Sequence, residues 1–155
     1  MKRFFIICCT LTMVYGSFEA VQAAPNFSGT WQLDVDRSDF GAKNPPAKAQ
    51  MQQVVLTLKQ TTSKLSIERS TGEVATYNLD GSESINSLPS GGQARTTLNW
   101  SGDTLVGTTI SNIGGNEVKM ADVRSLSGDG KEMVVKLSIQ MPSGERKQTL
   151  VYTKP

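Results

Sequence analysis

The sequence contains no histidine, and its two cysteines, Cys8 and Cys9, both lie close to the amino terminus. Without imidazole the chain cannot form a histidine-based catalytic triad, a histidine zinc site or an imidazole acid-base catalyst. Beyond Cys9 it also has no thiol for a disulfide, a metal or a nucleophile. The remaining reactive residue types occur in no nucleophile elbow, phosphate loop or metal-ligand cluster. We therefore expect no enzyme, no cofactor and no metal site.

Strong charge of one sign is absent as well. The 16 basic and 14 acidic residues give a net charge of +2 and are scattered along the chain, so no face predicts a nucleic-acid partner. Asp34 and Asp36 fall on one face of a predicted strand, since residues two apart share a face. A metal site or an acid pair is one interpretation of these carboxylates, and a solvated strand edge is the favoured one.

The first residues have the pattern of a secretory signal peptide, 1–23. Lys2 and Arg3 precede the largely apolar stretch 4–15, and Val21-Gln22-Ala23 supplies small residues for cleavage after Ala23. The apolar stretch is shorter than the roughly 20 residues of a stable membrane span, and no small-residue lipidation site precedes the cysteines. We expect export to the periplasm or the extracellular space, from a bacterial source. Residues 24–155 then form one domain, expected to be monomeric, since about 130 residues suffice for one core.

The rest of the chain alternates short strand patterns with glycine- and proline-containing turns and shows no convincing helix. Asp80-Gly81 is a typical signal for a tight hairpin turn, and 36–50, with Gly41, Pro45 and Pro46, is predicted to be a loop. The predicted strands are 28–35, 51–60, 64–70, 74–79, 82–87, 94–100, 104–112, 117–126, 132–141 and 146–153.

Short turns force neighbouring strands to pair antiparallel, because a parallel pair needs a crossover of a dozen or more residues. A meander of this length removes its exposed edges by closing on itself. The predicted fold is therefore an all-β antiparallel meander barrel of about 8–10 strands, with room for side chains or one small ligand. A β-sandwich is the alternative.

Two stretches resemble the calycins, the group of lipocalins and fatty-acid-binding proteins. The first is Phe27-Ser28-Gly29-Thr30-Trp31-Gln32-Leu33, which is similar to the Gly-Thr-Trp-Lys-Leu opening of fatty-acid-binding proteins. The second is the carboxy-terminal meander from Val123 through Asp129-Gly130-Lys131 to Lys154. The opening, extended to Ser38-Asp39-Phe40-Gly41, also resembles a group of secreted bacterial lipocalin-like proteins of unassigned role. Fatty-acid-binding proteins carry a helix-turn-helix lid after the first strand; the two prolines of 36–50 predict that any lid here is reduced or absent.

The resemblance also implies a ligand site. In fatty-acid-binding proteins an arginine on an inner strand and an Arg-x-Tyr pair on the last strand hold the ligand carboxylate. Arg124 matches the first position and Tyr152 the last, whereas Leu150 replaces the second arginine. Paired arginines compensate a buried carboxylate, so their loss favours a neutral ligand or none.

The predicted cavity walls are Leu150, Met120, Val135 and Leu137, with Arg124 or Tyr152 as the polar anchor. Trp31 is predicted to plug the closed end of the barrel. A bland interpretation stands beside each: Arg124 as a surface arginine, Tyr152 as a core ring with its hydroxyl at the rim. Likewise the alternating apolar residues Met133, Val135, Leu137 and Ile139 either fill the core or line a cavity.

Two functions of different class follow. The leading hypothesis is an exported, non-enzymatic carrier that buries a small apolar or amphiphilic ligand in the barrel. The alternative is an envelope-associated protein-interaction module with a filled core, which would act through loops such as 36–50. A barrel packed solid would contradict the first hypothesis.

Overall fold

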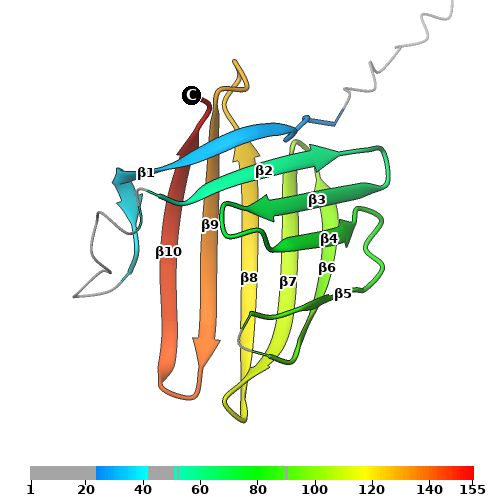
Figure 1. Ribbon diagram of the computed structural model, residues 1–155, viewed down its shortest axis with the longest axis vertical. Coiled ribbons are helices and arrows are strands. Elements are labelled where there is room, and N and C mark those ends of the chain that lie inside the picture. The colour runs from blue at the N-terminus through cyan, green and yellow to red at the C-terminus, as the bar shows by residue number, and fades with distance from the viewer. Residues whose placement is uncertain (1–23, 42–50, 52, 90) are drawn as a thin grey trace, which may run out of the picture.

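The computed structural model describes residues 24–41, 51, 53–89 and 91–155 (Figure 1). The signal peptide predicted for 1–23 and most of the predicted loop, 42–50, lie outside these residues. No helix in the described ranges is long and apolar enough to cross a membrane. The strands are β1 (Gly29–Asp39), β2 (Val55–Gln60), β3 (Lys64–Arg69), β4 (Val74–Asn78), β5 (Ser84–Ser87), β6 (Gln93–Ser101), β7 (Thr104–Ile113), β8 (Asn116–Leu126), β9 (Glu132–Met141) and β10 (Gly144–Thr153).

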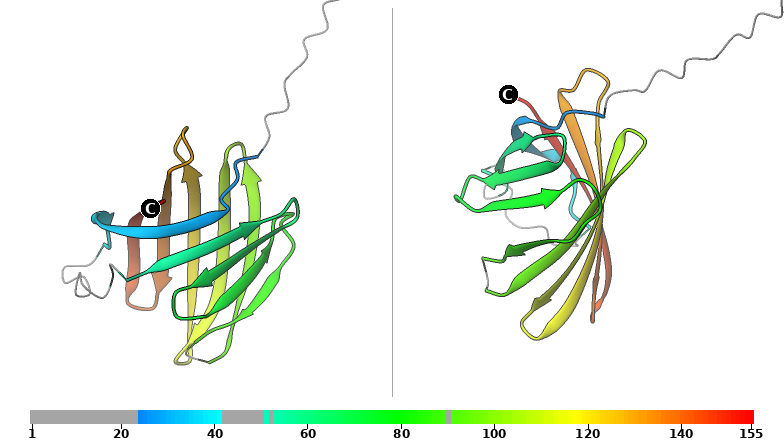
Figure 2. Two further views of the ribbon diagram at one scale, coloured as in Figure 1. Left: turned by 45° about the horizontal axis from the view of Figure 1, so that its top comes forward. Right: turned by 90° about the vertical axis from the view of Figure 1, so that its right-hand side faces the viewer.

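All ten strands belong to one antiparallel sheet in the order β4-β3-β2-β1-β10-β9-β8-β7-β6-β5. Consecutive strands therefore pair with each other except β4 and β5, which are the two ends of this order. Strand β1 pairs with β10 as well as with β2, and this pairing joins the two halves of the meander. In Figure 1 and in the left view of Figure 2, β1–β4 cross in front of β7–β10, and the sheet curls into a nearly closed barrel. The predicted all-β meander barrel is confirmed, and the β-sandwich alternative is not what forms.

Among the strands that the structure describes, β4 and β5 are consecutive in sequence but share no ladder; their junction is here called the seam. Gly81 has the positive φ of 83° expected of its turn, but the hairpin predicted around it is wrong. Side chains replace the missing backbone pairs. The Asn86 amide accepts a hydrogen bond from the Thr76 N–H (2.9 Å) and donates one to the Thr76 carbonyl (3.1 Å). The Ser84 hydroxyl likewise accepts from the Asn78 N–H at 2.8 Å.

Strand β1 is longer than predicted, because residues 36–39 belong to it and not to the loop. Their polar sequence lacks the apolar alternation that identifies a half-buried strand. A register shift between Asp34 and Asp39 in the pairing with β10 accommodates them. The Ser38 hydroxyl donates to the Asp34 carbonyl (2.6 Å) and accepts from the Val151 N–H (3.0 Å), which ties the irregular segment to β10.

The other boundaries lie within two residues of the prediction, apart from the start of β2. This strand begins at Val55 instead of 51, since the Val54 N–H turns back to bond the Met51 carbonyl at 3.1 Å.

Inward-facing apolar side chains form a continuous core. Its fully buried members are Phe27, Trp31, Leu58, Leu65, Leu98, Leu105 and Met133. Alternation along each strand directs these residues to the interior, because successive side chains of a strand point to opposite faces. The core leaves part of the interior unfilled, and that space contains the candidate site.

Candidate functional site

The barrel interior contains a cavity of about 310 Å³, here called the inner chamber. Its wall comes mainly from β2, β3, β8, β9 and β10. The lining residues are Leu56, Leu58, Ile67, Arg69, Met120, Arg124, Met133, Val135, Leu137, Ile139, Gln148, Leu150 and Tyr152. All six residues predicted to bind a ligand are among them, so the structure brings the predicted set together around one space. Their contact with a ligand stays a prediction.

Strand register explains why residues so far apart in sequence meet. Arg124 of β8 lies opposite Val135 of β9, and Val135 lies opposite Leu150 of β10. Each step along this antiparallel row keeps side chains on the same face of the sheet. Met120 joins the neighbouring part of the wall through its pairing with Ile139. The closed curvature of the sheet then turns this face inward.

Tyr152 is the most buried of the predicted polar anchors, with 6% of its surface exposed. Desolvation raises the pKa of its phenol above the usual value of 10.0, and the positive charges of Arg69 and Arg124 oppose that shift. The hydroxyl is therefore held in its neutral form, which can both donate and accept a hydrogen bond.

Arg124 is not a free cation, because it forms an ion pair inside the barrel. Its Nε lies 2.7 Å from Oδ2 of Asp122, and the two side chains are only 14% and 1% exposed. Asp122 was missed by sequence analysis, although its position two residues before Arg124 places it on the same face. Its other oxygen, Oδ1, has no hydrogen-bond partner among the described residues. It lies against Gly107, where a Cβ would collide with it and approach Leu98 Cδ2 to 2.7 Å.

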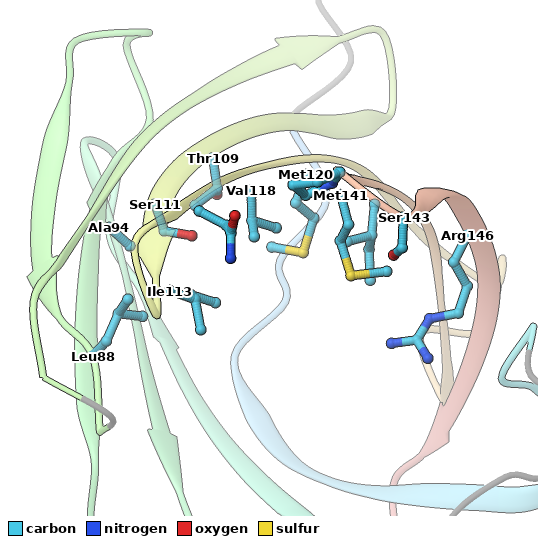
Figure 3. Close-up of a pocket in the computed structure, with 13 residues that line it drawn as sticks. Leu88, Ala94, Thr109, Ser111, Ile113, Val118, Met120, Met141, Ser143 and Arg146 are labelled. Carbon is cyan, nitrogen blue, oxygen red and sulfur yellow. The ribbon is translucent and has the colours of Figure 1, made fainter.

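A second and larger space of about 590 Å³, the outer chamber, was not predicted. Its lining residues are Leu88, Ala94, Thr109, Ser111, Ile113, Asn116, Val118, Met120, Ile139, Met141, Pro142, Ser143 and Arg146 (Figure 3). Met120 and Ile139 line both chambers, which are therefore adjacent. The outer chamber lies near the β7–β8 and β9–β10 turns, at the lower end of the barrel in Figure 1. Alternation on β7 and β8 is the signal that could have identified these residues.

Trp31 is fully buried in the core, and its indole N–H donates to the Phe27 carbonyl at 2.8 Å. The ammonium group of Lys154 lies over its ring, 4.6 Å from the centroid. Trp31 does not line either chamber. Its predicted role as a plug stays a prediction.

The chemistry of the two chambers suits binding. The lining residues offer hydrocarbon side chains with a few guanidinium, amide and hydroxyl groups, and no carboxylate is among those described. The described ranges also contain no group of three or more His, Cys, Asp or Glu placed to hold a metal ion. Mostly apolar walls with a few polar groups are typical of small-molecule sites, whose volumes run from about 300 to 1,000 Å³.

No family model and no curated protein sequence matches the chain. Among solved structures it is similar to the zebrafish ileal bile acid-binding protein in complex with cholic acid. The TM-score is 0.59 at 15% sequence identity, over 83% of this chain and 98% of the other. The likeness extends over nearly all of the neighbour and rests on fold, as the low identity shows. The chain thus has the fold of the fatty-acid-binding proteins, the calycin barrel.

Proposed function

We propose that this protein is an exported, non-enzymatic carrier of a small apolar or amphiphilic molecule, which it holds inside the barrel. The observation that carries the proposal is the pair of adjacent, mostly apolar chambers of about 310 and 590 Å³. A structural neighbour that holds cholic acid supports the same type of use for this fold. Export rests on the amino-terminal sequence pattern alone.

Burial of apolar ligand surface would provide the affinity. At about 25 cal/mol per Å², a ligand that buries about 300 Å² of apolar surface gains about 7.5 kcal/mol, before the entropic cost of association is subtracted. Leu137 and Ile139 supply such surface, while Tyr152 and Arg124 supply hydrogen bonds that fix orientation. A non-enzymatic role agrees with the lining residues that the structure describes, which include no carboxylate, thiol or imidazole.

The alternative is an interaction module, which requires a filled core. The interior formed by the described strands is not packed solid, because both chambers remain next to the core. The loop through which the module would act lies mostly outside the described residues.

Native mass spectrometry of protein purified without detergent from its own compartment tests the proposal. We expect an additional discrete mass that disappears on denaturation. Ile139→Trp, at the boundary of both chambers, should abolish it because the indole occupies ligand space. Gln140→Trp is the matched control, since the adjacent side chain is exposed on the outside of the same strand. Wild-type protein that stays free of ligand, even after incubation with a lipid mixture, would refute a carrier function.

A further inference from the structure

Among the described residues that line the outer chamber, Arg146 of β10 is the only cation. In Figure 3 its guanidinium group projects from the strand toward the interior, on the opposite side of the space from Leu88 and Ile113. Its Nε is buried and has no hydrogen-bond partner among the described residues. A buried donor without a partner costs about 1–3 kcal/mol, so the guanidinium group of Arg146 has hydrogen-bonding capacity left over.

The other two arginines that line a chamber already have acidic partners. Nε of Arg124 lies 2.7 Å from Oδ2 of Asp122, and Nε of Arg69 lies 3.8 Å from Oε2 of Glu73. The ion pairs within the described part of the chain include none for Arg146. An anion in the interior would therefore find its strongest compensation at Arg146, whereas at Arg124 it would compete with the Asp122 carboxylate.

The position of Arg146 also suits a charged group. It lies opposite Ile139, which borders both chambers, and only a short way from the β9–β10 turn. An anion near the end of a barrel keeps part of its hydration, which reduces the desolvation penalty of a deeply buried charge. The guanidinium fork then supplies charge-assisted hydrogen bonds to a carboxylate or a sulfate.

We propose that the outer chamber is an anion site, in which Arg146 holds the acidic group of an amphiphile while its apolar body extends past Ile139 into the inner chamber. This inference rests on the proposed carrier function. It assigns the acidic group to the β9–β10 end of the barrel instead of the Arg124 and Tyr152 position that the sequence resemblance implies. It also predicts an anionic ligand, whereas Leu150 in place of the second arginine favours a neutral one. Arg146, on the same strand as Leu150, supplies the positive charge that this arginine would have supplied.

A displacement titration tests the assignment. The mature protein is loaded with a neutral apolar fluorescent dye, which is then displaced by dodecanoate or by dodecanol, two ligands that differ only in the head group. Wild-type protein is expected to prefer dodecanoate. Arg146→Gln should weaken dodecanoate about 10- to 100-fold, as expected for loss of hydrogen bonds to a charged group, and leave dodecanol within about threefold.

Lys147→Gln is the matched control. It removes the same charge from the adjacent residue, which is exposed on the outer face and paired with Glu145, and both affinities should stay unchanged. Arg124→Gln separates the two possible positions of the acidic group.

The outcomes are distinguishable. The assignment is overturned if an Arg124→Gln protein that still binds dodecanol loses dodecanoate binding while Arg146→Gln keeps it. A wild-type protein that binds both ligands equally well overturns it too. In either case the carrier function stands, because the dye and dodecanol still bind. Failure of the wild-type protein to bind the dye and both ligands overturns the carrier function and this inference with it.

Discussion

The interior ion pair between Asp122 and Arg124 predicts an unusual response to mutation. Removal of one partner of a buried pair leaves the other charge uncompensated, at a cost of about 3–5 kcal/mol. Asp122 is only 1% exposed, and one of its oxygens has no partner among the described residues. Leaving its carboxylate unpaired therefore costs more free energy than leaving the Arg124 guanidinium unpaired. Arg124 is 14% exposed and borders the inner chamber, where water or a ligand can reach it.

We therefore expect Arg124→Met to lower the free energy of unfolding by about 3–5 kcal/mol, and Asp122→Asn by a smaller amount, about 1–2 kcal/mol. The double variant is the decisive measurement. Asp122→Asn destabilises the wild-type protein but should stabilise the Arg124→Met protein by about 1–3 kcal/mol, because it removes the stranded carboxylate charge.

Urea denaturation followed by tryptophan fluorescence measures all four proteins. Arg95→Met provides a surface control, since its 3.8 Å contact with Glu83 is solvent-exposed and should contribute less than about 1 kcal/mol. If Asp122→Asn destabilises both backgrounds equally, the two side chains act independently and the reasoning from the ion pair is refuted.

Three further predictions concern packing, the seam and pH. Gly107→Ala should destabilise the barrel by about 1–3 kcal/mol in thermal or urea unfolding because its new Cβ has no room, whereas Gly128→Ala, with nothing within 4 Å, should stay near wild type. Asn86→Ala should accelerate amide hydrogen exchange at Thr76 at least severalfold by nuclear magnetic resonance, since both bonds to that residue are lost; unchanged exchange would mean that the seam is held by other contacts. The raised pKa of Tyr152 means that the folded state binds the phenolic proton more tightly than the unfolded state does. The resulting contribution to the free energy of unfolding is complete below pH 10 and is lost as pH rises beyond it. The free energy of unfolding should therefore fall less steeply above pH 10 in Tyr152→Phe than in wild type, and parallel curves would contradict this.

Alternation along the strands made most of the fold predictable. On β8, Met120 and Arg124 are four residues apart and so share a face, and the structure places that face in the interior next to Val135 of β9, whereas the sequence left Arg124 open between the interior and the surface. The same rule puts Asp122 between them, yet the ion pair was overlooked because a carboxylate in a barrel interior contradicts its usual preference for solvent. Residues 36–39 were missed as strand for the related reason that their side chains are all polar or charged and show no apolar alternation.

Other features depend on contacts that no local pattern contains. The seam at Asn86 exists because β4 and β5 diverge after a turn whose sequence is typical of a hairpin. The outer chamber exists because β7–β10 curve around a space that their side chains do not fill. The Nε of Arg146 has no partner among the described residues, whereas Arg124 and Arg69 have acidic partners. This difference depends on which side chains meet in the folded barrel.

The sequence by itself determined the all-β class, the meander order and the inward faces of the strands, because period-two alternation and glycine turns are local properties of the chain. It also excluded chemistry that needs an imidazole, since a residue type that is absent cannot be supplied by folding. The tertiary structure decided which interior volume stays empty and which interior charges are paired. Cavity volume and charge compensation depend on distances between side chains of different strands, and closure of the barrel sets those distances.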